Sequence, residues 1–192
     1  MQKLALSIPE VVLLTPKKHD DDRGWFVETY NRRTLAAAGI DATFVQDNQS
    51  LSTQRGTIRG LHFQTAPHMQ AKLVRVLQGA VYDVAVDLRA GSPSYGRWCA
   101  ATLTAEEGQQ IFIPAGFAHA FCTLAPDTMV AYKVDGYYAR DCEGGLRWDD
   151  PDLAIDWPVA AADVHVSDKD ARLPLLRDFT SPFVFRTSVA RP

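Results

Sequence analysis

The sequence predicts a mainly β protein, an antiparallel sandwich or barrel, on three observations. Helical periodicity is scarce along its 192 residues. Short stretches rich in Val, Ile, Leu and aromatic residues are separated by turn residues, as expected of successive strands. Several stretches also place apolar residues at every second position, the pattern of a strand with one buried face.

One early helix and ten strands are predicted. The helix covers residues 31–38, where Asn31 is a suitable N-cap and Gly39 a suitable stop. Gly79 permits a tight hairpin between two of the strands, and Pro114 and Gly116 provide a turn between two others. The strands are predicted at residues 11–15, 25–30, 44–50, 57–63, 72–77, 80–88, 97–104, 110–114, 119–123 and 129–134.

The stretch VYDVAVDLR, residues 81–89, illustrates the alternation. Asp83, Asp87 and Arg89 share one face, whereas Tyr82 and Leu88 belong to an apolar face. This pattern predicts a half-buried strand with one polar side.

Regular alternation stops after residue 134. The following segment is rich in turns and carboxylates and predicts an ordered covering arm, with Trp148 and Trp157 as buried anchors. Ser167 is placed to cap a short helix within residues 167–174. Because no repeat or low-complexity linker interrupts the chain, residues 1–192 are expected to form a single domain.

Composition narrows the class of protein. The formal net charge is −3, and basic residues lie among acidic neighbours, as in residues 17–23, so a nucleic-acid partner is not expected. A hydrophobic fraction of 46% without a long apolar run predicts a globular protein with no membrane partner. The N-terminus lacks the pattern of a secretory signal, which leads us to expect a cytoplasmic protein.

The three cysteines, Cys99, Cys122 and Cys142, follow no CxxC spacing. Their odd number and their spacing favour neither a disulfide framework nor a zinc site. We expect small structural residues at these positions.

The stretch RGTIRGLHFQ, residues 55–64, carries the most informative chemistry. His62 on a short strand is either a positioned general base or a hydrogen-bonded core residue. In an ideal strand Arg59 and His62 point to opposite faces. If both contact one ligand, we therefore expect the strand to bulge or twist at Gly60.

Other residues favour proton transfer over metal chemistry. A metal-binding cupin would present two histidines separated by one residue, but GLHFQ has one. Lys72, at the start of a strand, is either a solvated lysine or a cation that stabilises an enolate. Tyr132 is either a packed core residue or a phenol that returns a proton to carbon.

Eight segments between about residue 10 and about residue 176 resemble one known family in order and sequence. They are DDRGWFVETYN, TFVQDNQS, RGLHFQ, AKLVRVLQGAVYDVAVDLR, SPSYGRW, IPAGFAHAF, YKVDGYY and RWDDPDLAIDWP. The family is the dTDP-4-dehydrorhamnose 3,5-epimerases. The resemblance implies a cupin-like jelly roll, a homodimer with exchanged N-terminal strands, and no metal or cofactor. It also implies epimerisation of dTDP-4-dehydro-6-deoxy-D-glucose at carbons 3 and 5.

By this resemblance, four residues match the catalytic positions. His62 matches the general base, and Asp170 matches the carboxylate that pairs with it, with Asp168 as a competing candidate. Lys72 matches the group near the keto oxygen, and Tyr132 matches the proton donor.

The resemblance also implies a set of nucleotide-sugar contacts. Arg59 and Arg23 suit the diphosphate, because guanidinium groups bind phosphate oxygens in pairs. Tyr138 would stack on thymine, with the partner subunit's Phe26 as a second slab. The remaining matches are Glu28, Gln46, Asp47, Asn48, His119, Glu143 and Lys169.

Three other functions stay open at this level. An epimerase that inverts only one of the two carbons would keep the same residues. A non-catalytic cupin that binds a sugar nucleotide predicts loss of the base or the donor. A metal-dependent cupin oxygenase or isomerase predicts a histidine pair that residues 60–64 lack.

Overall fold

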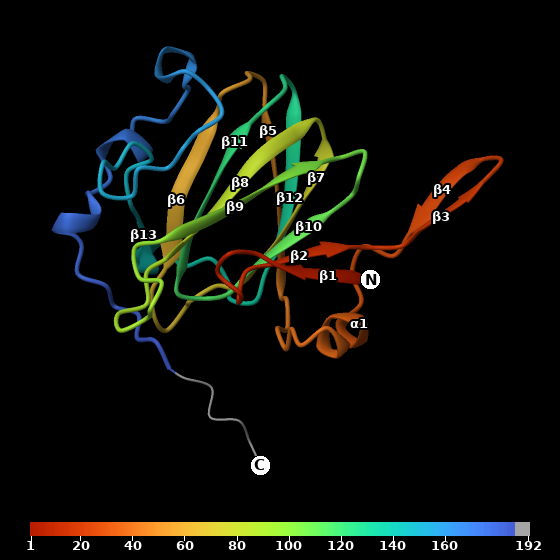
Figure 1. The fold of residues 1–192 in the computed structure, drawn as a ribbon, viewed down its shortest axis with the longest axis horizontal. Coiled ribbons are helices and arrows are strands. Elements are labelled where there is room, and N and C mark those ends of the chain that lie inside the picture. Colours follow the sequence, from red (N-terminus) through yellow and green to blue (C-terminus); the bar gives the residue numbers. More distant parts are fainter. Residues whose placement is uncertain (187–192) are drawn as a thin grey trace.

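The computed structural model describes residues 1–186 and consists mainly of two antiparallel sheets facing each other. Figure 1 shows this double layer, with a separate hairpin reaching away from it. The architecture confirms the mainly β, jelly-roll prediction. The six-stranded sheet has the order β1 (Gln2–Ala5), β2 (Val12–Thr15), β10 (Gln110–Ile113), β7 (Lys72–Gln78), β12 (Thr128–Val134) and β5 (Gln46–Ser52).

The five-stranded sheet faces the first across the core. Its order is β13 (Glu143–Gly145), β6 (Ile58–Gln64), β11 (Phe117–Thr123), β8 (Ala80–Asp87) and β9 (Trp98–Thr104). The projecting hairpin is formed by β3 (Lys18–Asp21) and β4 (Gly24–Val27). Side chains such as Val74, Val130 and Phe121 meet between the two sheets and form the main core.

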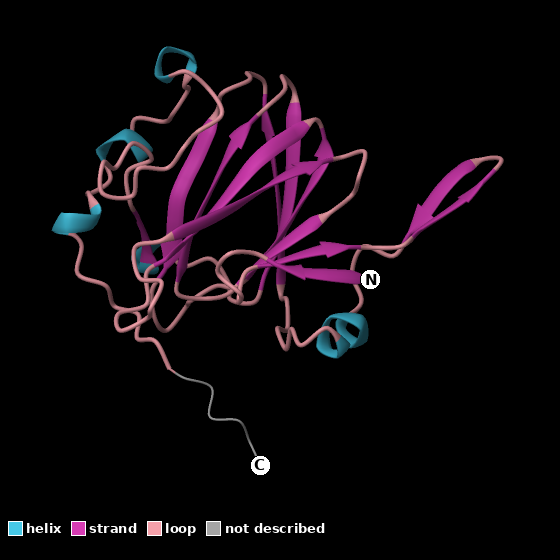
Figure 2. Cartoon of the chain, viewed as in Figure 1, coloured by secondary structure: helices cyan, strands magenta, loops and turns pink. Residues whose placement is uncertain are grey.

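The early helix is confirmed as α1 (Arg32–Ala37). The Asn31 side chain accepts hydrogen bonds from the backbone N–H groups of Arg33 and Thr34, which would otherwise lack partners. Leu35 is buried against Leu14 and its neighbours in a second apolar cluster. The remaining helices are single 3₁₀ turns, visible in Figure 2: η1 (Arg140–Cys142), η2 (Ala161–Asp163), η3 (Asp170–Arg172) and η4 (Leu176–Asp178).

Three observed strands were not predicted from the sequence: β1, β3 and β13. All four residues of β1 are exposed, and β3 reads KHDD, so neither shows apolar alternation. Strand β13 contains two glycines. These segments are extended because an edge or a hairpin partner offers backbone hydrogen bonds, which side-chain patterns do not reveal.

The prediction of a half-buried strand at residues 81–89 was wrong. Strand β8 is covered on both sides, since Val81 and Ala85 face the core between the sheets while Val84 and Val86 pack under the C-terminal arm. The supposed polar face is therefore the interior.

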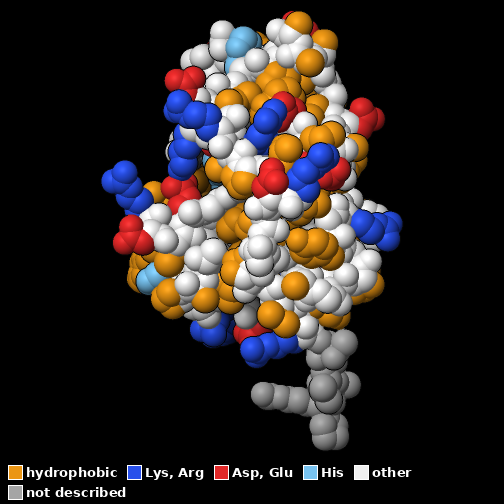
Figure 3. All heavy atoms as spheres, turned by 90° about the vertical axis from the view of Figure 1, so that its left-hand side faces the viewer, with side chains coloured by type: hydrophobic (Ala, Val, Ile, Leu, Met, Phe, Trp, Pro, Cys, Tyr) orange, Lys and Arg blue, Asp and Glu red, His pale blue; other side chains and the backbone are white. Residues whose placement is uncertain are grey.

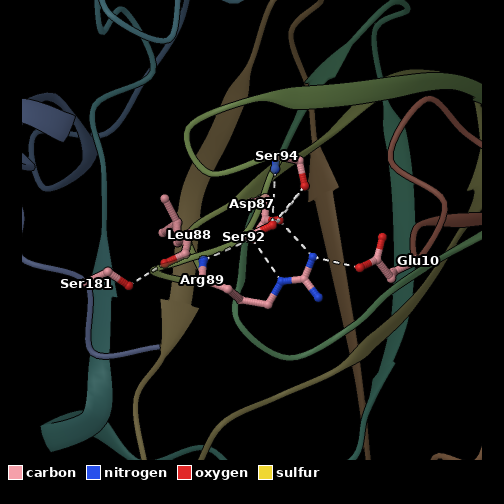
Figure 4. Close-up of polar contacts among 7 residues, drawn as sticks. All are labelled: Glu10, Asp87, Leu88, Arg89, Ser92, Ser94 and Ser181. Carbon is pink, nitrogen blue, oxygen red and sulfur yellow. Dashed lines mark hydrogen bonds and ion pairs between the residues drawn. The ribbon is translucent and has the colours of Figure 1, made fainter. Parts of the chain in front are cut away.

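Asp87 is one of two aspartates that β8 buries completely. Its carboxylate accepts hydrogen bonds from the Arg89 guanidinium and from the hydroxyls of Ser92 and Ser94, at 2.6–2.9 Å (Figure 4). Burial alone would raise the pKa of Asp87, but these donors outweigh burial and lower it. The network ties the end of β8 to the following loop.

The predicted covering arm lies over the outer face of the five-stranded sheet. Trp157 packs against this sheet beside Tyr82, but Trp148 and Trp157 are half-buried rather than buried. The Ser167 hydroxyl accepts a hydrogen bond from the Asp170 N–H at 3.1 Å, but the expected helix is only the 3₁₀ turn η3, whose N-cap residue is Lys169. On the face shown in Figure 3, positive and negative side chains lie next to one another. None of the helices in residues 1–186 has the length and hydropathy to cross a bilayer.

Candidate active site

A pocket of about 550 Å³ opens between the two sheets. His62 and His119 reach it from the five-stranded sheet, whereas Lys72 and Tyr132 reach it from the six-stranded sheet. A smaller hollow of about 140 Å³ shares three of these side chains and extends the pocket. The wall of the larger pocket also includes Ser50, Ser52, Arg59, Lys169 and Asp170, and that of the smaller one Gln46, Asn48, Tyr138 and Glu143.

His62 is paired with Asp170, at 2.8 Å between Nε2 and Oδ1. This resolves the choice between the two aspartates, because Asp168 is exposed and Asp170 is buried. Burial raises the pKa of Asp170, but the His62 imidazole and the Gly60 N–H outweigh burial and lower it. An ionised Asp170 holds the proton of neutral His62 on Nε2, which leaves Nδ1 as the basic nitrogen.

Strand β6 is irregular at Gly60, as expected if Arg59 and His62 share a ligand. On β11, His119 lies opposite His62 and Phe121 opposite Arg59, so β6 holds one extra residue. Gly60 has a φ of 131°, and a Cβ there would lie 2.4 Å from the Ala120 side chain. The bulge lets both side chains line the same pocket.

Lys72 is buried with its Nζ 3.2 Å from the His62 carbonyl oxygen, to which it donates a hydrogen bond. Burial lowers the pKa of Lys72 to about 8, although the negative charges of Asp83 and Glu143 oppose this shift. Lys72 is therefore mostly protonated at neutral pH and loses its charge as the pH rises through about 8. An ammonium so placed can stabilise an oxyanion inside the pocket.

Tyr132 approaches the pocket from the wall opposite His62. It belongs to β12 of the six-stranded sheet, whereas His62 belongs to β6 of the five-stranded sheet. Burial raises the pKa of the Tyr132 phenol, so the group stays protonated at neutral pH. The pocket thus has a base on one side and a proton donor on the other.

Arg59 lines the larger pocket. Its Nε donates a hydrogen bond to the Ser52 hydroxyl at 3.1 Å, and a terminal nitrogen donates to the Leu51 carbonyl at 3.0 Å. No carboxylate neutralises its charge among the hydrogen bonds and ion pairs of residues 1–186. The guanidinium is consequently available to an anion.

Tyr138, Glu143 and Lys169 form a second polar cluster beside the pocket. Lys169 Nζ lies 2.6 Å from the Glu143 carboxylate, to which the Tyr138 hydroxyl also donates at 3.3 Å. Burial opposes ionisation of Glu143, but Lys169 outweighs burial and lowers the pKa of Glu143. The backbone N–H of Tyr138 donates to Gln46, whose amide in turn donates to Asn48.

Four predicted site residues do not line this pocket. Asp47 alternates with Gln46 and Asn48 along β5, and its side chain turns outward to pair with Lys133 at 2.7 Å. The sequence resemblance had grouped all three, but strand pleating separates them. The others, Arg23, Phe26 and Glu28, lie on or just after the projecting hairpin and contact neither hollow.

Two serines and one aspartate of the pocket region were missed from the sequence. Ser52 orients Arg59, and the buried Ser50 hydroxyl has no hydrogen-bond partner within residues 1–186. Asp83 holds His119 with both oxygens at 3.0 Å. The sequence did contain a signal for Asp83, because a carboxylate within the apolar stretch VYDVAVD is expected to be buried and to need a hydrogen-bonding or charged partner.

No metal site is evident across residues 1–186, where no three His, Cys, Asp or Glu side chains converge. Cys99 and Cys122 are buried, and burial raises the pKa of each thiol to about 11. These two thiols stay protonated at neutral pH and suit structural positions.

An imidazole oriented by a carboxylate and faced by a phenol across a jelly-roll pocket characterises an isomerase that moves protons on carbon. Comparison with known proteins agrees. The chain belongs to the dTDP-4-dehydrorhamnose 3,5-epimerase family, whose model matches residues 5–178.

Individual relatives support this assignment along nearly the whole chain. The dTDP-4-dehydrorhamnose 3,5-epimerase of Sinorhizobium fredii is 48% identical over 94% of this chain and 92% of its own. The crystal structure of the enzyme from Bacillus anthracis, with TDP and PPi bound, matches with a TM-score of 0.87 and 49% identity over 91% of this chain and 99% of that one. The crystal structure of the Legionella pneumophila enzyme in complex with dTDP-4-keto-L-rhamnose matches with a TM-score of 0.90 and 41% identity. The match covers 96% of this chain and 98% of that one.

Proposed function

We propose that this chain epimerises dTDP-4-dehydro-6-deoxy-D-glucose at carbons 3 and 5, giving dTDP-4-dehydro-L-rhamnose in dTDP-L-rhamnose biosynthesis. The observation that carries the proposal is the placement of His62 and Tyr132 on opposite walls of one pocket. Inversion requires a proton to leave one face of the sugar ring and another to arrive on the opposite face. Two opposed groups meet this requirement without turning the substrate over.

The chemistry begins with proton abstraction next to the 4-keto group. His62 Nδ1 takes the proton, and the C–H electrons form an enolate whose negative charge develops on the keto oxygen. Asp170 stabilises the resulting imidazolium through its 2.8 Å contact with Nε2. The Lys72 ammonium stabilises the enolate oxygen.

Reprotonation from the opposite wall completes the inversion. Tyr132 donates its phenolic proton to the carbanion carbon, and solvent restores the proton to Tyr132 and removes one from His62. Repeating the sequence at the second carbon gives the doubly inverted product. Substrate and product have the same composition and oxidation state, because each proton removed by His62 is replaced by one from Tyr132. The reaction therefore needs no other reactant.

In this proposal the thymine and the diphosphate, which joins the deoxyribose to the sugar, have separate partners. Arg59, held by Ser52, binds the diphosphate, and Tyr138 stacks on thymine. Other polar groups line the sugar-nucleotide path: Gln46, Asn48, His119, Glu143 and Lys169.

Deuterium incorporation tests the function. Incubation with dTDP-4-dehydro-6-deoxy-D-glucose in deuterated water should place deuterium at both carbons, as read by NMR. The Tyr132→Phe variant should still exchange but complete inversion at least ~100-fold more slowly, because the base remains and the donor is lost. Tyr137→Phe, an exposed neighbour outside the pocket, serves as the matched control.

Other outcomes of this experiment select other functions. Exchange at one carbon alone identifies a single-carbon epimerase. No exchange identifies a non-catalytic sugar-nucleotide-binding cupin.

The projecting hairpin leads us to include a homodimer in the proposal. Trp25 and Phe26 are 59% and 70% exposed on β4, and the Arg23 side chain is 89% exposed beside them. A monomer has little reason to hold two large apolar side chains in water on a protruding hairpin. In the proposed dimer each hairpin is exchanged and brings Arg23, Phe26 and Glu28 to the partner's pocket.

Mixed dimers test this arrangement. Arg23→Ala and His62→Ala should each be nearly inactive as homodimers. Co-expressed chains should recover about a quarter of wild-type activity, because half of randomly formed dimers are mixed and each holds one intact site. No recovery in purified mixed dimers would mean that Arg23 acts within its own chain.

A further inference from the structure

Asp83 lies beneath the pocket and is not accounted for by the proposed mechanism. Its side chain is completely buried in the middle of β8. Within residues 1–186, the side-chain hydrogen bonds to its carboxylate come from His119 alone, with Nε2 at 3.0 Å from each oxygen. A buried carboxylate below a site for an anionic substrate is costly, which calls for a compensating role.

From this geometry we infer that Asp83 is a positioning residue that maintains the charge of Lys72 and the tautomer of His119 during epimerisation. The inference rests on the proposed function, because it gives Lys72 the task of stabilising the enolate. It adds a residue that touches no substrate and acts through two residues that line the pocket.

The tautomer follows from the hydrogen bond. A neutral imidazole whose Nε2 faces a carboxylate carries its proton on that nitrogen, so Nδ1 has no proton. Burial lowers the pKa of His119, with Asp83 opposing and Lys72 and His62 reinforcing the shift. His119 is therefore neutral at pH 7 and presents an acceptor nitrogen away from Asp83, suited to a sugar hydroxyl.

The charge of Lys72 follows from its surroundings. His62 on β6, His119 on β11, Tyr132 on β12 and Glu143 on β13 line the hollows with Lys72, and Asp83 on β8, hydrogen-bonded to His119, acts on Lys72 through its charge. The pocket also holds the cations Arg59 and Lys169 and the carboxylate of Asp170. Of the three carboxylates, Asp170 is engaged by His62 at 2.8 Å and Glu143 by Lys169 at 2.6 Å. Asp83 has no such competing cation, so its charge acts mainly on Lys72 and His119.

The Asp83→Asn variant tests this inference. The amide keeps the shape and one acceptor oxygen for His119 but removes the charge. Wild-type kcat/KM should fall as the pH rises through about 8, where Lys72 loses its proton. In Asp83→Asn this alkaline limb should move about one pH unit lower, because removing a nearby negative charge makes the ammonium less favourable.

Asp87→Asn is the matched control. Asp87 is equally buried on the same strand but belongs to the Arg89 and serine network of Figure 4. Both variants should lower the Tm, but only Asp83→Asn should shift the alkaline limb. A folded Asp83→Asn enzyme with a wild-type limb overturns the inference while leaving the deuterium test of the proposed function intact.

Wild-type enzyme labelled with ¹⁵N-histidine gives a second test, which does not depend on the folding of Asp83→Asn. NMR at pH 7 should show His119 as the neutral tautomer with its proton on Nε2. A proton on Nδ1 instead would contradict the role of Asp83. Assignment by comparison with His119→Gln identifies the resonance.

Discussion

Replacing His62 by alanine is expected to lower kcat/KM by about a thousand-fold or more and to remove deuterium exchange at both carbons. General-base catalysis contributes roughly 10²–10⁴-fold, and no other group on this wall is arranged to replace it. His119, opposite His62 on the neighbouring strand, is engaged by Asp83. The effect should appear in kcat, because the base acts on substrate that is already bound.

His68→Ala provides the control for this change. His68 is exposed, lies six residues further along the chain and lines neither hollow. Its replacement should leave exchange unchanged. Deuterium exchange by His62→Ala at the wild-type rate would exclude His62 as the base.

The Lys72→Met variant is expected to separate activity from stability. Removing a preorganised stabiliser of a developing oxyanion costs roughly 10²–10³-fold in kcat, and both exchange and inversion should fall together. Stability at pH 7 should rise or stay unchanged, because methionine fills a similar volume without the cost of burying an ammonium. The measurement pairs single-turnover kinetics with thermal unfolding.

The sign of the stability effect follows from the pKa of Lys72, which folding lowers to about 8. Between pH 8 and the higher pKa of an unfolded lysine, the unfolded chain binds more protons, so the contribution of Lys72 to stability rises with pH there. The stability gain of Lys72→Met should therefore be largest below pH 8 and shrink above it.

Lys133→Met, on the outward side of β12, should preserve activity. A Lys72→Met enzyme with wild-type kcat would refute the proposed role of Lys72.

Much of the fold and part of the pocket could be predicted, because they depend on patterns among residues that are close in the sequence. Apolar alternation identified most strands, and the Asn31 cap and Gly39 identified α1. The requirement that Arg59 and His62 share a ligand predicted the irregular strand at Gly60. These features depend on side-chain period and backbone freedom, which neighbouring residues determine.

The partner of His62 depended on long-range structure. Asp170 lies 108 residues away, on an arm without regular periodicity, and only the path of that arm distinguishes it from Asp168. The outward turn of Asp47 follows from alternation along β5, but its pairing with Lys133 likewise depended on how β5 pairs with β12. Such contacts follow from packing between distant segments and leave no local signal.

The sequence by itself determined that the protein is mainly β and that RGTIRGLHFQ carries a basic histidine beside a guanidinium, because strand periodicity and side-chain chemistry are local properties. The tertiary structure alone decided how that histidine is used. It brought Asp170 to Nε2, placed Tyr132 on the opposite wall, and buried Asp83 under the pocket. Each of these depends on two sheets closing over one core, where the facing strands come from distant parts of the chain.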